Sequence, residues 1–136
     1  MKFKKISYLV LIGVGTFFIS RYIQSILKKP PVAKIAYMTF DKTEHDFFNL
    51  KKDQADSVYF VYRNTSKNPL KIEDISSRCG CTIPIWSKKE LMPNQKDSIL
   101  VSYDAKEDGY FSKGIYIISN SETSPDVLYI KGTVIE

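Results

Sequence analysis

The sequence SVYFVYR at residues 57–63, followed by NTSKNP at residues 64–69, decides the fold class of this chain. The first stretch is rich in β-branched and aromatic residues, which favour strands, and the second is a cluster of turn-forming residues that ends the strand. The same succession of strand and turn continues on both sides of this pair. No helical periodicity of useful length occurs after residue 30, so the chain beyond that point is predicted to be all-β.

Further short strands are predicted on either side of residues 57–63. They comprise residues 44–50, 70–75, 81–86, 97–103, 110–119 and 126–134. Residues 37–40 alternate only weakly, and Pro84 restricts the run 81–86 to the edge of a sheet. Seven or so strands, spaced by about a dozen residues with turns between them, predict an antiparallel β-sandwich of the immunoglobulin kind. The cysteine and tryptophan spacing of antibody domains is absent, because Trp86 follows Cys81 too closely.

The 136 residues leave room for one folded domain after an N-terminal segment. We expect a membrane anchor or signal segment at residues 1–31, a linker at residues 32–41 and the immunoglobulin-like domain at residues 42–136. The chain has 43% hydrophobic and 13% aromatic residues, which suits a packed domain better than a disordered tail.

Residues 6–20 contain no charged side chain. Lys2, Lys4 and Lys5 precede this apolar run, and Arg21, Lys28 and Lys29 follow it. A helix of about 22 residues spans a bilayer if the Arg21 side chain reaches the interface. A cleaved signal peptide has a similar pattern, but the sequence offers no well-placed pair of small residues for cleavage. We therefore favour one uncleaved transmembrane helix, with the N-terminus inside and the domain exported.

The positive net charge of this chain is concentrated before Pro30. Of the 20 basic residues, six precede Pro30, which leaves 14 basic against 15 acidic residues in the predicted domain. A nearly neutral domain presents no basic face for phosphates, so nucleic acid is not an expected partner.

Several short motifs occur in a fixed order along the predicted domain. They are EHDF at 44–47, FVYRNT at 60–65, LKI at 70–72, SRCGCT at 77–82, MPN at 92–94, GYFSK at 109–113, SN at 119–120 and LYIKG at 128–132. In this order they resemble the bacterial family of domains of unknown function numbered 1573, over about residues 40–135, and CGCT is the most specific string. The resemblance implies an immunoglobulin-like sandwich that is exported or anchored at a bacterial membrane, with the domain outside the cytoplasm. It implies no activity.

The chain departs from that family pattern at three turn positions. Phe48, Ser66 and Asn94 stand where the family has glycine. Asparagine adopts the left-handed backbone conformation readily, whereas phenylalanine does so at a cost. We therefore expect the first turn, at Phe48, to depart furthest from the family pattern.

Cys79 and Cys81 are the only two cysteines, and Gly80 allows the chain to turn between them. The pair has three interpretations. It is a structural pair at a turn (either free or disulfide-linked), a thiol redox site or a soft-metal site. Two thiolates suit reduced copper, and His45 is a third candidate ligand. A zinc site needs four ligands, which would require carboxylates or a second chain. Redox catalysis normally uses two intervening residues at a helix N-terminus, and Arg78 is the only basic neighbour here.

Hydrolytic motifs are absent from the sequence, and one histidine with scattered serines does not make a triad. Acidic pairs such as Glu44 with Asp46 read as solvated side chains. We therefore expect no catalytic residues and no cofactor. The favoured function is a non-enzymatic interaction or structural module of the cell envelope that contacts another envelope protein or a surface polymer, with Tyr110 and Phe111 as candidate contacts. The alternative is copper binding or thiol redox chemistry at Cys79 and Cys81.

Overall fold

The structure, a computed structural model, describes residues 19–22 and 35–136 of the chain. Residues 19–22 form a helical turn. Within the described ranges, no helix is both long and apolar enough to cross a bilayer. The rest of the transmembrane helix predicted within residues 1–31 lies outside the described residues. The chain divides into two units, and the second, Lys34–Glu136, contains all of the strands.

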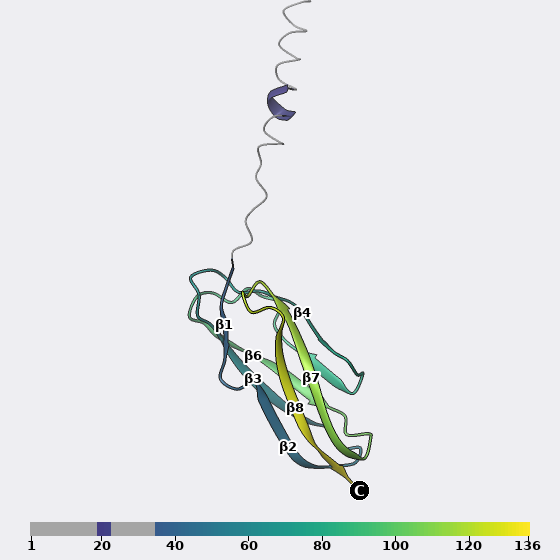
Figure 1. The fold of residues 1–136 in the computed structure, drawn as a ribbon. Coiled ribbons are helices and arrows are strands. Elements are labelled where there is room, and N and C mark those ends of the chain that lie inside the picture. The colour runs from purple at the N-terminus through teal and green to yellow at the C-terminus, as the bar shows by residue number, and fades with distance from the viewer. Residues whose placement is uncertain (1–18, 23–34) are drawn as a thin grey trace, which may run out of the picture. The chain divides into compact units, whose positions relative to one another are not determined.

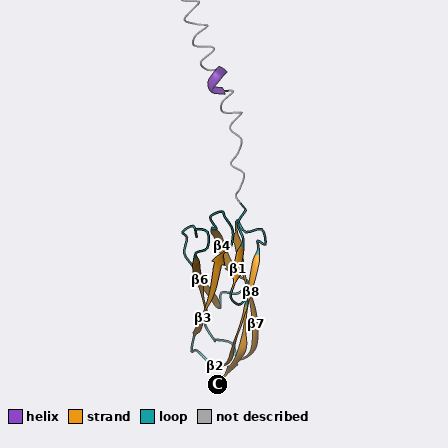
Figure 2. Ribbon diagram, turned by 90° about the vertical axis from the view of Figure 1, so that its left-hand side faces the viewer, coloured by secondary structure: helices purple, strands orange, loops and turns teal. Residues whose placement is uncertain are grey.

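Eight strands make up the second unit. In chain order they are β1 (Met38–Phe40), β2 (Glu44–Lys51), β3 (Asp56–Asn64), β4 (Ile72–Ser77), β5 (Thr82–Ile85), β6 (Lys96–Tyr103), β7 (Gly109–Ser119) and β8 (Asp126–Ile135). One sheet has the order β1-β3-β6-β5 and the other has the order β2-β8-β7-β4. Figure 1 shows β2, β8 and β7 side by side in one layer with β3 and β6 behind them, and Figure 2 shows the two layers from the side.

The predicted all-β sandwich is confirmed, with two corrections. The strands number eight, because the weakly alternating β1 pairs with β3 and buries Met38. β1 also overlaps the segment expected as a linker at residues 32–41. The sandwich is not wholly antiparallel, because β2 runs parallel to β8. Only three residues join β1 to β2, and the chain changes sheet there without a hairpin reversal.

Alternate residues of β3, β6, β7 and β8 face the space between the sheets and form most of the core. In β3, Val58, Phe60 and Tyr62 are buried, and residues between them face outward. The Tyr103 and Phe111 rings stack across the sheets with their centroids 3.9 Å apart. The prediction that Phe111 contacts a partner is wrong, because this side chain is only 5% exposed. Tyr110, the other predicted contact, is exposed.

Two turn positions where the family pattern has glycine adopt a left-handed backbone. Phe48 has φ 55° and Asn94 has φ 65°. Phe48 lies at the bulge of β2, where its N–H donates to Asp46 Oδ1 at 2.8 Å. Its carbonyl oxygen lies 3.1 Å from the point where a Cβ would stand on Gly132. Phenylalanine therefore occupies a left-handed position at this bulge that glycine adopts more readily.

Asn64 is a fully buried polar residue at the end of β3. Its Nδ2 donates to the carbonyls of Asn68 and Leu91, both at 2.8 Å. Its Oδ1 accepts hydrogen bonds from the N–H and the hydroxyl of Ser66. Asn64 thus ties the turn after β3 to the turn before β6, which explains why an asparagine stands in the motif NTS.

Candidate functional site

Cys79 and Cys81 form a disulfide, and their Cα atoms are 5.2 Å apart. The bond closes the turn between β4 and β5. These two strands are end strands of different sheets, so the disulfide lies where the chain crosses from one sheet to the other. β5 is an edge strand, as Pro84 predicted. In this oxidised state neither sulfur is a thiolate, and a metal would need the pair to be reduced first.

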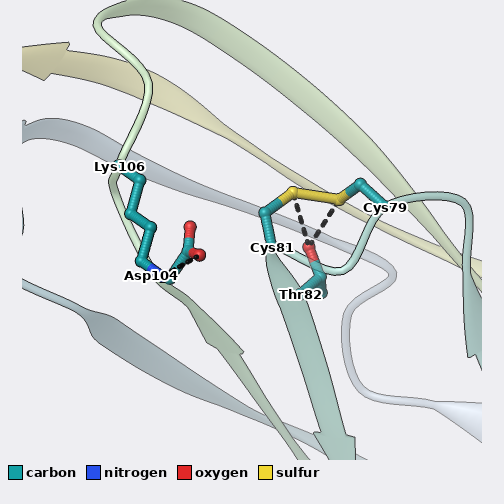
Figure 3. Close-up of polar contacts among 5 residues, drawn as sticks. All are labelled: Cys79, Cys81, Thr82, Asp104 and Lys106. Atoms are coloured by element: carbon teal, nitrogen blue, oxygen red, sulfur yellow. Dashed lines mark hydrogen bonds and ion pairs between the residues drawn. A yellow bond between two sulfur atoms is a disulfide. The ribbon is translucent and has the colours of Figure 1, made fainter.

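Hydroxyl groups on either side of the turn hold it in place. Thr82 is buried, and its Oγ1 lies 3.6 Å from Cys79 Sγ and 3.9 Å from Cys81 Sγ, as Figure 3 shows. Because neither sulfur of a disulfide carries a proton, the Thr82 hydroxyl is the donor. The Ser77 hydroxyl donates to the carbonyl of Cys79 at 2.7 Å. The Asp104 N–H donates to the carbonyl of Cys81 at 3.1 Å.

A groove of about 360 Å³ lies beside the disulfide. The residues that line it are Arg78, Cys79, Ser112, Lys113, Gly114 and Tyr116. The ladder between β4 and β7 ends at the pair Ser77 and Ile115, whereas β7 continues to Gly109. The groove therefore occupies the position beside β7 that a longer β4 would fill. We call it the Arg78 groove.

His45 does not join the cysteines. It lies on β2, and β2 and β4 are at opposite edges of the same sheet. Its Nδ1 is 3.2 Å from Lys42 Nζ, and burial and then the Lys42 charge lower the pKa of His45. Within residues 19–22 and 35–136, no three side chains of the His, Cys, Asp and Glu types gather as a metal site. Copper binding by the reduced cysteine pair stays a prediction, without His45 as a third ligand.

A second candidate site lies on the outward face of the sheet β1-β3-β6-β5. Tyr59, Leu100 and Ile85 are direct cross-strand neighbours on β3, β6 and β5 and form what we call the outer row. Tyr59 is 61% exposed and Ile85 is 59% exposed. Ile83, on the same face of β5, is 57% exposed. Three strands thus present a continuous apolar stripe to solvent, which is a common property of interaction surfaces.

Two charged side chains lie on the same outward face as the outer row. Among the outward positions of these four strands, Arg63 and Lys96 are cationic and directly opposite each other. No outward position of these strands carries a carboxylate. Lys96 reaches Asp41, which lies in the turn after β1, at 3.6 Å.

Sequence reasoning missed both the outer row and the Arg78 groove. The alternation in residues 57–63 contained a signal for the first, because both alternate sets, Val58, Phe60 and Tyr62 against Tyr59 and Val61, are apolar. A strand that is apolar on both faces either lies in the interior or presents one apolar face outward. The groove depends on where β4 stops relative to β7, and no local pattern in the sequence reports that register.

The two four-stranded sheets, their edge strands and the turn between them define a β-sandwich domain. The structure resembles the ASH / PapD-like domain 7 of human CEP192, with 11% identity, a TM-score of 0.62 and coverage of 81% of this chain and 91% of that chain. It also resembles a protein of unknown function from Porphyromonas gingivalis W83, with 16% identity and a TM-score of 0.65. That match covers 79% of this chain and half the length of the Porphyromonas protein. At these identities the likeness shows the fold alone.

The sequence itself assigns the family. The family described as "Protein of unknown function (DUF1573)" matches residues 38–134, and the chain belongs to it. This confirms the resemblance carried by the CGCT string and the motifs around it. No curated protein matches the chain.

Proposed function

We propose that this chain is a non-enzymatic interaction module of the bacterial cell envelope. Residues 1–31 hold it at the membrane as a single-pass anchor, and the sandwich lies outside the cytoplasm. The observation that carries the proposal is the outer row, an apolar stripe across three strands with cationic neighbours and no outward acid. No catalytic residue or cofactor has a part in this function.

The partner that fits this face is another envelope protein with an apolar surface flanked by acidic side chains. Apolar contact at the centre with charge complementarity at the rim is typical of such interfaces. Addition of a strand to the β5 edge is disfavoured, because Pro84 has no N–H and interrupts the donor series of that edge. We therefore place the contact on the face of the sheet rather than at its edge.

The interface test uses site-specific photo-crosslinking in the intact bacterium. A photoreactive phenylalanine analogue replaces Tyr59 in the full chain, and the control carries it at Tyr129, which is 47% exposed on the other sheet. We expect a cross-linked envelope protein at position 59 and not at position 129. The purified partner must then bind the full chain, with affinity lowered by salt and by Tyr59→Ser with Ile85→Ser. Binding that these substitutions leave unchanged, or an adduct with a second copy of the chain, would contradict the proposal.

The anchor and the location are tested separately. Protease added to spheroplasts should digest the sandwich while the cytoplasmic membrane is intact, and deletion of residues 1–31 should abolish membrane attachment. A sandwich that resists protease until the membrane is lysed would place the domain inside the cell and overturn this part of the proposal.

A further inference from the structure

The Arg78 groove contains two cationic side chains that lack carboxylate partners. The ion pairs among the described residues join Lys52 to Asp108, Lys96 to Asp41, Lys106 to Asp104 and Lys131 to Glu44. Neither Arg78 nor Lys113 is paired with an acid in that part of the chain. Cations left unpaired in a concave site favour an anionic ligand.

Arg78 is already held in position over the groove. Its guanidinium carbon lies 5.5 Å from the centre of the Tyr116 ring, on which it rests by a cation–π contact. A guanidinium stacked on a ring keeps its N–H edge available for a carboxylate. Gly114 leaves space on this side of β7, because it has no side chain and a Cβ there would already contact the Tyr116 ring at 3.6 Å. The site therefore has a positioned donor group, a second cation and space.

The disulfide lies at the wall of the same groove. Cys79 lines the groove, whereas the Cys81 side of the turn faces Asp104 and its partner Lys106, as Figure 3 shows. An anion in the groove would thus lie on the Cys79 side of the disulfide, away from the Asp104 carboxylate. The Thr82 hydroxyl is within 3.9 Å of Cys81 Sγ and can donate to a thiolate formed there.

We propose that the Arg78 groove binds the carboxylate of a low-molecular-mass thiol and that the Cys79–Cys81 disulfide exchanges with this thiol. The thiolate of the ligand attacks Cys79 Sγ and forms a mixed disulfide. The bond between the two cysteines breaks, and its electron pair leaves on Cys81 Sγ, which takes up a proton from water. A second thiol molecule attacks the mixed disulfide and releases Cys79 as a thiol and the ligand as its symmetrical disulfide. Two ligand thiols are oxidised and the protein disulfide is reduced.

The test compares three thiols of similar size and different charge on the purified full chain in detergent. They are 3-mercaptopropionate, which is anionic, 2-mercaptoethanol, which is neutral, and cysteamine, which is cationic. The rate of disulfide reduction is measured by alkylation and mass spectrometry and is expressed per thiolate. One exposed ion pair changes a rate or affinity by roughly 1.5- to 5-fold, so two cations predict a two- to thirty-fold preference for the anionic thiol at low salt. Cysteamine should be the slowest of the three.

The decisive variant is Arg78→Gln with Lys113→Gln. We expect it to lose the preference for 3-mercaptopropionate over 2-mercaptoethanol. An unchanged Tm relative to the wild-type chain shows that the fold is intact. The matched control, Lys67→Gln with Lys71→Gln, removes the same charge at the opposite end of β4 and should keep the preference. Equal rates for the anionic and neutral thiols in the wild-type chain, or a preference lost in both double variants, would overturn the proposal.

Discussion

Gly132 on β8 is the position where one added methyl group should cost the most. A Cβ there would stand 2.9 Å from Phe111 Cζ, 3.0 Å from Phe111 Cε1 and 3.1 Å from the Phe48 carbonyl oxygen. The Phe111 ring cannot simply withdraw, because it is stacked on Tyr103. Because the ring is held, this overpacking should cost roughly 2–3 kcal/mol, from which the lower chain entropy of alanine recovers roughly 0.5–1 kcal/mol.

We therefore expect Gly132→Ala to lower the free energy of unfolding by about 1–2 kcal/mol. For a domain of this size that corresponds to a fall in Tm of roughly 5–15 °C, measured by circular dichroism on the full chain. The control is Gly114→Ala on β7, where the nearest atom would be 3.5 Å away, in ordinary van der Waals contact. The double variant Gly132→Ala with Phe111→Leu should lose less than the two single variants together. Equal Tm values for Gly132→Ala and Gly114→Ala would refute the steric reasoning.

Three further predictions concern the turns and the core. Asn64→Ala should lower the free energy of unfolding by about 3 kcal/mol in urea denaturation, because it leaves two carbonyls and the Ser66 groups unpaired, whereas Gln54→Ala at an exposed amide should stay within about 0.5 kcal/mol. Burial and then the Asp97 charge raise the pKa of Tyr62 to about 12. The folded state therefore holds the Tyr62 proton more tightly than the unfolded chain does, so the stability that Tyr62 contributes is complete below pH 10 and is lost as the pH rises through 12. Between pH 9 and pH 11, the free energy of unfolding of Tyr62→Phe should therefore fall by about 1 kcal/mol less than that of the wild-type chain. Phe48→Gly should be about 0.5–1 kcal/mol more stable than Phe48→Ala and should have the higher Tm, because glycine adopts the left-handed backbone without strain. Equal Tm values for the two variants would mean that the bulge is unstrained.

The fold class was readable from the sequence because each strand contains a local signal. β3, β6, β7 and β8 combine alternation with β-branched residues and end at clusters of turn residues. β1 was ambiguous, because three residues are too few to show a period and its strand character comes from pairing with β3. The parallel pairing of β2 with β8 was not predicted. It depends on contact between strands about 80 residues apart in the sequence, which no local pattern can predict.

The candidate site was predictable in its chemistry and not in its surroundings. Cys79 and Cys81 are recognisable as a candidate site from the sequence, since they are the only cysteines in the chain. Their environment comes from residues more than thirty positions away, because Lys113 and Tyr116 reach the groove through the register of β4 with β7. His45 was considered as a partner of the cysteines from its chemistry alone, and the sheet order separates them.

The parallel alignment of β2 with β8 has a mechanical consequence for a domain tethered at its N-terminus. Tension applied between the tether and the C-terminus would enter β2 near Glu44 and leave β8 near Ile135, so the two strands would be pulled past each other lengthwise. In that geometry the interstrand hydrogen bonds share the load instead of opening one after another. The three residues of β1 would detach first, and the β2–β8 pair would determine the force at which the domain unfolds. Single-molecule stretching should then record one high-force event, which a proline at Asn49 should abolish.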